Sequence, residues 1–203
     1  MKVIAIGRNY IDHAKELNNP VPASPVIFMK PDTAVLKDNK DFYYPEFSKD
    51  IHYECELVVR ICNEGKHVTS KFAHKYYDAI GLGIDFTARD IQAEQKAKGL
   101  PWELAKAFDH SAVISNMIAK EEFESINNIN FSLQKNGEIV QKGNTKNMIF
   151  DVESLIVYIS KYITLRKGDL IYTGTPAGVG PVQIGDKLQG FIEDREMFTT
   201  HIK

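Results

Sequence analysis

The sequence is poor in cysteine, and this narrows the classes of protein that it can encode. Only Cys55 and Cys62 carry thiols among 203 residues. Two cysteines with six residues between them match neither a zinc-ligand spacing nor the disulfide framework of a small secreted domain. We expect both thiols to be reduced and packed in or beside a strand. A chain of this length buries enough apolar surface to form a sizeable core without covalent cross-links.

Long apolar runs and an excess of one charge are also absent. No segment approaches the roughly 18 consecutive apolar residues of a membrane-spanning helix. Residues 1–7 lack the apolar stretch and cleavage site of a secretory signal. Lysine and arginine number 25 against 27 acidic residues, so no basic surface for nucleic acid or an anionic membrane is indicated. The expected location is the cytoplasm.

The order of apolar and polar residues predicts a β-rich α+β protein. The chain has no internal repeat, low-complexity tract or Ser/Gly linker, so we expect residues 1–203 to form one domain. About ten strands and four short helices are predicted, without the regular strand–helix alternation of a doubly wound fold. The principal expected strands are residues 2–6, 26–29, 51–61, 81–86, 170–173, 187–192 and 197–202.

Turn and cap signals divide these strands. Asn136-Gly137 favours a type I′ turn, which predicts a hairpin over residues 131–140. Asp151 is placed to cap a helix whose apolar residues follow helical spacing. Within the N-terminal strand and lid segment, residues 1–20, a short helix or lid is expected at 9–18. Three prolines make the following residues, 19–25, a loop.

Three carboxylates are the most informative feature. Glu54 and Glu56 alternate along the expected strand 51–61, which places both side chains on one face. A solvent-facing acidic strand edge would show the same pattern. Asp85 favours a functional site instead, because it ends an apolar run in which an ionised side chain is costly to bury. Three such oxygen ligands suit Mg²⁺ or Mn²⁺ better than zinc.

Two other features leave alternatives at this stage. His52 shares the expected face of Glu54 and Glu56 and is a candidate fourth ligand, although we favour a place beside the ligands or at the surface. The glycine-rich residues 174–180 could bind phosphate or form a simple turn. They lack the Gly-Lys-Ser/Thr of a phosphate-binding loop and open no clear helix, which argues against nucleotide binding.

Four motifs resemble those of the fumarylacetoacetate hydrolase family and occur in that family's order. They are Gly7-Arg8-Asn9-Tyr10 with Asp12-His13, His52-Tyr53-Glu54-Cys55-Glu56-Leu57, Gly83-Ile84-Asp85-Phe86-Thr87-Ala88-Arg89-Asp90, and the loop Tyr172 to Gly180. Residues 87–106 are similar to the short branch that includes acylpyruvate hydrolases and oxaloacetate decarboxylases. Cys55 departs from the aliphatic residue expected between the glutamates, and it should point away from the metal.

The resemblance implies a mixed β-roll or sandwich of the fumarylacetoacetase C-terminal-domain type, assembled as a homodimer. By position it implies that Glu54, Glu56 and Asp85 bind Mg²⁺ or Mn²⁺, with Ca²⁺ as a possible substitute in crystals. It also implies roles for six other residues. His13 and Glu16 match a catalytic pair on a mobile lid, Lys106 a catalytic and substrate-binding residue, and Arg8, Gln92 and Thr175 contacts to the substrate.

These roles suit the cleavage of a C–C bond in a small 2-oxo acid. His13 would activate water, with Glu16 orienting its ring, and Lys106 would stabilise the charge of a pyruvate enolate. Acylpyruvate hydrolysis and oxaloacetate decarboxylation both pass through that enolate. Two alternatives remain: an isomerase similar to 2-hydroxyhepta-2,4-diene-1,7-dioate isomerase of aromatic catabolism, and a non-catalytic protein that binds metal and oxo acids.

Overall fold

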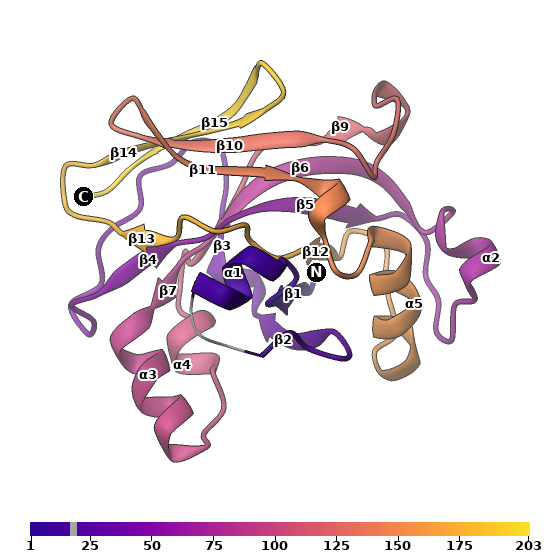
Figure 1. Cartoon of the computed structure of the whole chain (residues 1–203), viewed down its shortest axis with the longest axis horizontal. Helices are drawn as coiled ribbons and strands as arrows, with labels where there is room; N and C mark the ends of the chain where they lie inside the picture. Colours follow the sequence, from indigo (N-terminus) through magenta and orange to yellow (C-terminus); the bar gives the residue numbers. More distant parts are fainter. Residues whose placement is uncertain (17–19) are drawn as a thin grey trace.

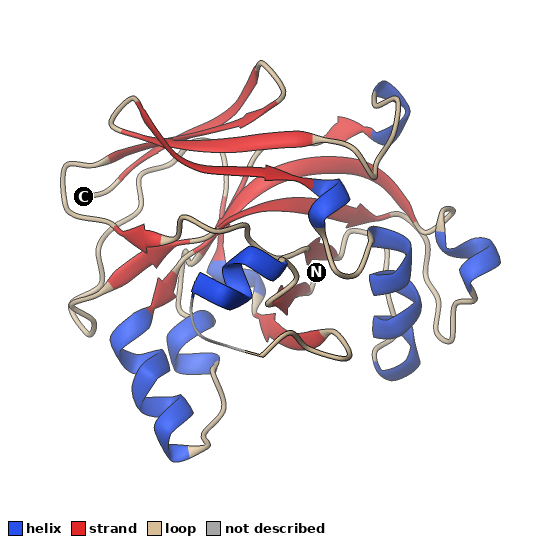
Figure 2. Cartoon of the chain, viewed as in Figure 1, coloured by secondary structure: helices blue, strands red, loops and turns tan. Residues whose placement is uncertain are grey.

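The computed structural model describes residues 1–16 and 20–203, and its described part is built mainly from three β-sheets (Figures 1 and 2). The largest sheet has eight strands in the order β2-β1-β12-β5-β6-β8-β3, with β9 paired to β6 outside that path. A second sheet has the order β11-β10-β14-β15, and a third has the order β13-β4-β7. This arrangement confirms the expected β-rich α+β class.

The described residues form fifteen strands, several of only two or three residues. They are β1 Val3–Gly7, β2 Val26–Lys30, β3 Val35–Leu36, β4 Ile51–Tyr53, β5 Cys55–Ile61, β6 Tyr77–Asp85, β7 Thr87–Ala88, β8 Ala112–Ile114, β9 Ile118–Ala119, β10 Asn130–Lys135, β11 Glu138–Asn144, β12 Leu170–Tyr172, β13 Gly180–Pro181, β14 Lys187–Ile192 and β15 Arg195–His201. The α-helices are α1 Ile11–Glu16, α2 Ser70–Ala73, α3 Arg89–Lys98, α4 Glu103–Lys106 and α5 Val152–Tyr162.

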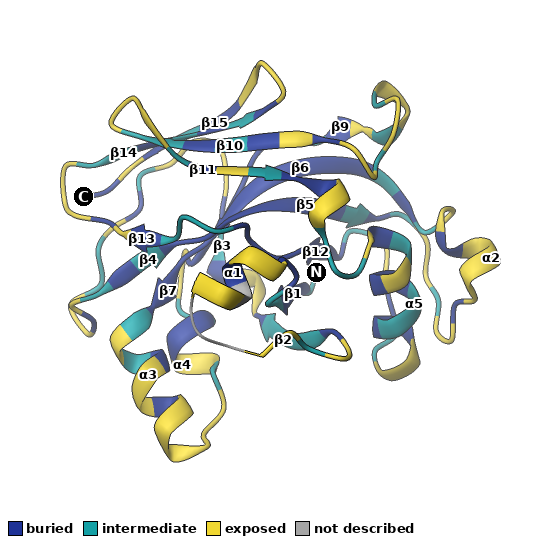
Figure 3. Ribbon diagram, in the orientation of Figure 1, coloured by how far each residue is buried: buried dark blue, intermediate teal, exposed yellow. Residues whose placement is uncertain are grey.

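The core lies between the four-stranded sheet and the large sheet, whose central strands β5 and β6 are buried (Figure 3). Leu57 and Val59 of β5 join the main apolar cluster, while Val58 between them joins a second cluster on the opposite face. Because both faces are covered, the strand is a nearly continuous apolar run. Gly190 of β14 allows close approach of the sheets, since a Cβ there would lie 2.8 Å from Leu82 Cδ2.

The expected strand at residues 51–61 is wrong at one position. The chain leaves the three-stranded sheet after Tyr53 and enters the large sheet at Cys55, so Glu54 lies between two strands. β4 pairs with β7 and β13, whereas β5 pairs with β6 and β12. The alternation of side chains continues through the break, and for this reason the sequence pattern does not reveal it.

The turn and cap predictions are confirmed where they can be compared. Asn136 and Gly137 have φ angles of 55° and 87° and join β10 to β11. The Asp151 carboxylate accepts a hydrogen bond from the Ser154 N–H at 2.8 Å and begins α5. Residues 17–19 of the expected lid and loop lie outside the described residues. None of the helices that the structure describes has the length and apolarity needed to cross a bilayer.

Candidate active site

Glu54, Glu56 and Asp85 come together where two sheets meet. Glu54 links β4 to β5, Glu56 lies in β5, and Asp85 ends β6. The Asp85 N–H donates to the Glu54 carbonyl at 2.8 Å, which holds the two strand ends side by side. All three residues are buried, and one carboxylate oxygen from each lies within 4.8 Å of the others. The structure thus gathers the acidic residues that the sequence pattern indicates.

Two lysines and an arginine offset part of this negative charge. Lys106 Nζ lies 2.9 Å from Glu54 Oε2 and 2.7 Å from Asp85 Oδ2. Lys30 Nζ lies 2.6 Å from Asp85 Oδ1, and Arg89 Nη2 lies 2.6 Å from Glu54 Oε1. Burial by itself raises the pKa of Glu54, but the charges of Lys106 and Arg89 outweigh burial and lower that pKa overall. Glu54 is therefore ionised at neutral pH.

Glu56 has a different environment, and it supports the metal-site interpretation. Its side chain is almost fully buried, and among the described residues it forms no ion pair and accepts one hydrogen bond, from the Gly174 N–H at 2.7 Å. Burial, and then the charges of Asp85 and Glu54, raise the pKa of Glu56 well above its ordinary value. Ionised Glu56 needs a further cation to balance it. The all-oxygen donor set fits a hard divalent ion such as Mg²⁺ or Mn²⁺.

His13 closes the site from α1. The ring is almost fully buried, with Nδ1 3.2 Å from Glu16 Oε2. Glu16 Oε1 accepts a hydrogen bond from the Gly178 N–H at 3.0 Å, which docks α1 onto the glycine-rich loop. In Figure 1 this helix lies across the centre of the molecule, near β1. When the Nδ1 proton is donated to Glu16, Nε2 is left as the acceptor, as a general base requires.

A small cavity of about 30 Å³ is lined by His13, Glu54 and Lys106. Arg8 and Gln92, two residues expected to contact substrate, also line it. The cavity has room for only a water molecule or two, so the described arrangement is a closed one and a 2-oxo acid enters only when part of the lining moves. The Arg89 guanidinium, hydrogen-bonded to Gln92 Oε1 at 2.7 Å, belongs to the same wall.

Thr175 lies behind the carboxylates and does not line this cavity. Its hydroxyl donates to the Cys55 carbonyl at 2.9 Å and accepts from Gln141 Nε2 at 2.9 Å. Gln141 Oε1 in turn accepts from the Cys55 N–H at 2.9 Å. This network holds the glycine-rich loop against β5 and so positions the adjacent Gly174 N–H on Glu56. The predicted contact of Thr175 with substrate stays a prediction.

Gly174 cannot carry a side chain in this arrangement. Its φ is 97°, and a Cβ there would lie 2.7 Å from Asn9 Cβ and 3.2 Å from the Ile6 carbonyl oxygen. Asn9 fastens the same region, because its amide donates to the carbonyls of Thr173 and Phe150 at 2.8 and 2.9 Å. The N-terminal motif and the glycine-rich loop therefore pack directly against each other beside the carboxylates.

Three residues at this centre are absent from the sequence-based set: Lys30, Arg89 and Gln141. Lys30 directly follows the apolar run 26–29, just as Asp85 follows an apolar run. The signal that indicated Asp85 could therefore also have indicated Lys30. Arg89 lies within a motif that the sequence comparison already includes. No local signal marks Gln141, since its partners come from β5 and the glycine-rich loop.

The structure also places His52 and Cys55. His52 Nε2 lies 2.9 Å from Asp50 Oδ1, and His52 is not part of the carboxylate group, in line with the interpretation favoured from the sequence. The Cys55 side chain packs in the main apolar cluster, away from the carboxylates, and both cysteines are free thiols.

Comparison with known proteins identifies the family of this chain. The family model described as fumarylacetoacetate (FAA) hydrolase C-terminal matches residues 2–203. The chain belongs to the fumarylacetoacetate hydrolase family. It is 44% identical over 189 residues to a mitochondrial oxaloacetate decarboxylase of Dictyostelium discoideum, covering 93% of this chain and 87% of that protein. It is 41% identical over 190 residues to a mitochondrial oxaloacetate tautomerase of Bos taurus, covering 94% and 86%.

Solved structures of this family share the fold. The crystal structure of fumarylpyruvate hydrolase from Pseudomonas aeruginosa, in complex with Mn²⁺ and pyruvate, superposes with a TM-score of 0.94 at 33% identity. The alignment covers 100% of this chain and 89% of that one. The expected fumarylacetoacetase C-terminal-domain fold is confirmed. The names of these three relatives describe enzymes that cleave or isomerise small oxo acids.

Proposed function

We propose that this chain is a divalent-metal-dependent enzyme that converts a small 2-oxo carboxylic acid through a pyruvate enolate, by acylpyruvate hydrolysis, oxaloacetate decarboxylation or both. The main support is a group of three buried carboxylates, one of which, Glu54, lines the same cavity as His13, the partner of Glu16. The names of the decarboxylase and fumarylpyruvate hydrolase relatives support the same chemistry. In this proposal residues 1–203 act as one catalytic domain.

Glu54, Glu56 and Asp85 would hold Mg²⁺ or Mn²⁺, and the bound ion would supply Lewis acidity toward the 2-oxo group of the substrate. Arg8 and Gln92, on the cavity wall, would bind and orient the substrate. The hydrogen-bond donors of Arg8 and Gln92 and the candidate base His13 line the same cavity, so together they would position a small acid for reaction.

In hydrolysis, His13 Nε2 would take a proton from a water molecule that attacks the distal carbonyl carbon. Glu16 would hold the ring and stabilise its protonated form. The C–C bond then breaks, and its electron pair passes to the pyruvate enolate, which Lys106 would stabilise from the cavity wall. In decarboxylation, CO₂ leaves and its bond electrons form the same enolate, so no water needs activation.

Isomerisation is the second candidate, and the tautomerase relatives favour it. A proton moved from one carbon or oxygen of a 2-oxo acid to another needs a base and a stabilised enolate. His13 and Lys106, which line the same cavity, would supply both functions. The isomerase similar to 2-hydroxyhepta-2,4-diene-1,7-dioate isomerase falls in this class.

The test is pyruvate release from acetylpyruvate and from oxaloacetate with Mg²⁺, with Mn²⁺ and with EDTA. His13→Ala is the active-site variant, and His74→Ala, at an exposed position, is its control. We expect metal-dependent release that is lost in the first variant and kept in the second. Ketone–enol interconversion of oxaloacetate, followed by ultraviolet absorbance, reports the isomerase. Bound metal without turnover in any assay would indicate a non-catalytic binding protein.

The homodimer and the cytoplasmic location stay predictions. Light scattering coupled to size-exclusion chromatography checks the first, because the subunit mass is 23.0 kDa and a dimer has twice that mass. A monomer that keeps full activity would contradict the expectation that two copies assemble.

A further inference from the structure

The ammonium group of Lys106 bridges two of the three buried carboxylates. Nζ lies 2.9 Å from Glu54 Oε2 and 2.7 Å from Asp85 Oδ2, and the Lys106 side chain is only 4% exposed. The ammonium also donates to the Thr87 hydroxyl at 2.6 Å. It is therefore a buried cation whose hydrogen-bond partners are oxygens, and it uses two of the carboxylates that a metal ion at this centre would use.

The second oxygen of each of these two carboxylates has a cation of its own. Lys30 Nζ lies 2.6 Å from Asp85 Oδ1, and Arg89 Nη2 lies 2.6 Å from Glu54 Oε1. Lys30 is itself fully buried and fastened, because its ammonium also donates to the Ser111 hydroxyl at 2.9 Å. Both carboxylates would therefore keep their places if the Lys106 ammonium moved away from them.

The charges of this group give a reason for such a movement. With all three carboxylates ionised, their negative charges equal the positive charges of the two lysines and the arginine that pair with them. A divalent ion adds two positive charges to the same buried space, and like charges repel strongly where little water separates them. Lys106 lines the cavity beside the carboxylates, so its ammonium has a direction in which to move.

We propose that Lys106 is an internal counter-ion that competes with the divalent metal ion for Glu54 and Asp85, and that metal binding moves its ammonium toward the cavity. This inference rests on the proposed function, because it takes the three carboxylates as the metal site. The metal affinity is then lower than the carboxylates alone would give. The ammonium is free to contact an enolate in the cavity only when the metal ion is bound, which links metal binding to catalysis.

Calorimetric titration of Mn²⁺ into protein freed of metal with EDTA and then desalted tests this role. Lys106→Met removes the ammonium, and Lys106→Gln removes the charge but keeps an N–H donor for the same oxygens, which protects the fold. We expect both variants to bind Mn²⁺ at least about tenfold more tightly than the parent protein, because one positive charge no longer opposes the ion. Lys106→Arg keeps the charge and should bind Mn²⁺ no more tightly than the parent.

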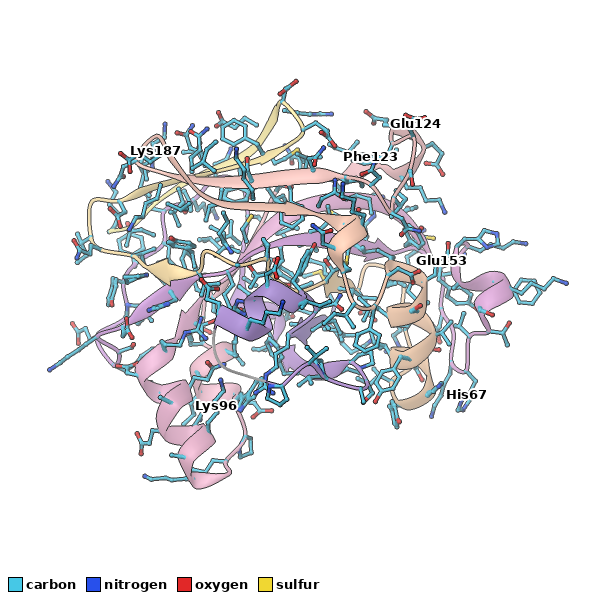
Figure 4. The ribbon with its side chains drawn as sticks, viewed as in Figure 1. His67, Lys96, Phe123, Glu124, Glu153 and Lys187 are labelled. Atoms are coloured by element: carbon cyan, nitrogen blue, oxygen red, sulfur yellow. The ribbon has the colours of Figure 1, made fainter. Side chains whose placement is uncertain are left out.

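Lys96→Met is the matched control, because Lys96 lines the same cavity but pairs with no carboxylate among the described residues. Figure 4 shows Lys96 beside α3 and below α1. Its side chain is exposed, so solvent screens its charge and its loss should change the Mn²⁺ affinity by less than about twofold. An equal rise in affinity in the Lys96 and Lys106 variants would overturn the proposal, because it would show an effect of net charge alone.

The outcomes separate this inference from the proposed function. Parent-like or weaker Mn²⁺ binding in both neutral Lys106 variants would overturn the counter-ion role and leave the metal-dependent reaction in place. Tighter binding in those variants, from a parent that turns over none of the substrates, would support the counter-ion role and contradict the proposed function. No Mn²⁺ binding by the parent or by any variant would overturn both.

Discussion

Lys30→Met tests how the buried charges of this centre support the fold. Lys30 Nζ is fully buried and lies 2.6 Å from Asp85 Oδ1, an oxygen that has no other polar partner among the described residues. The ammonium also donates to the Lys106 carbonyl and to the Ser111 hydroxyl, the latter at 2.9 Å. Methionine keeps the length of the side chain but leaves one oxygen of Asp85 buried and unpaired.

Breaking a buried ion pair by removing one partner costs about 3–5 kcal/mol. Asp85 Oδ2 keeps its contact with Lys106 at 2.7 Å, so we expect a value near the lower end. For a chain of this size, about 3 kcal/mol corresponds to a decrease in melting temperature of about 6–12 °C. Lys2→Met is the control, because Lys2 also pairs with an aspartate, Asp169, but is 28% exposed. Its loss should cost at most about 1 kcal/mol.

The assay is thermal unfolding followed by circular dichroism. EDTA is present so that bound metal does not mask the loss of charge. Urea unfolding of the same variants gives the free energy of unfolding. We expect the Lys30 variant to melt well below both the parent protein and the Lys2 variant. Equal melting temperatures for the two variants would refute the reasoning, because they would show that the buried ammonium contributes no more than a partly exposed one.

Three further predictions concern the metal centre and the loop behind it. Glu56→Gln should weaken Mn²⁺ binding by at least about a hundredfold, measured by calorimetry, and parent-like affinity would exclude Glu56 as a ligand. The pKa of Glu56 is raised in the metal-free protein, so a proton competes with the metal ion for this carboxylate. Mn²⁺ affinity should therefore fall as the pH falls through that pKa. Calorimetry over a pH series checks this, and an affinity that rises toward acid pH would contradict it. Gln141→Leu leaves the buried Cys55 N–H without its acceptor, so the free energy of unfolding, measured in urea, should fall by about 1–3 kcal/mol. The variant should also lower kcat/KM, because Gln141 no longer holds the loop at Thr175 in place. Unchanged kinetics would show that this loop does not contribute to catalysis.

Sequence patterns predicted the regular elements best where one local signal dominates. The strand at residues 187–192 has the expected bounds, and the cap at Asp151 and the turn at Asn136-Gly137 occur as expected. Strands of only two residues, such as β7 and β13, were missed because so few residues show no period. The break at Glu54 was missed for a related reason, since the same alternation continues from one sheet into the next.

The sequence by itself determined the acidic members of the site. Glu54 and Glu56 are two residues apart on extended backbone, and this spacing alone directs their side chains to one side. Asp85 was recognisable because it interrupts an apolar run. Only the tertiary structure decided which cations stand against these carboxylates, because Lys30, Arg89 and Lys106 reach them from β2, α3 and α4. Ion pairing depends on distance in space, and strand pairing between segments far apart in the chain sets that distance.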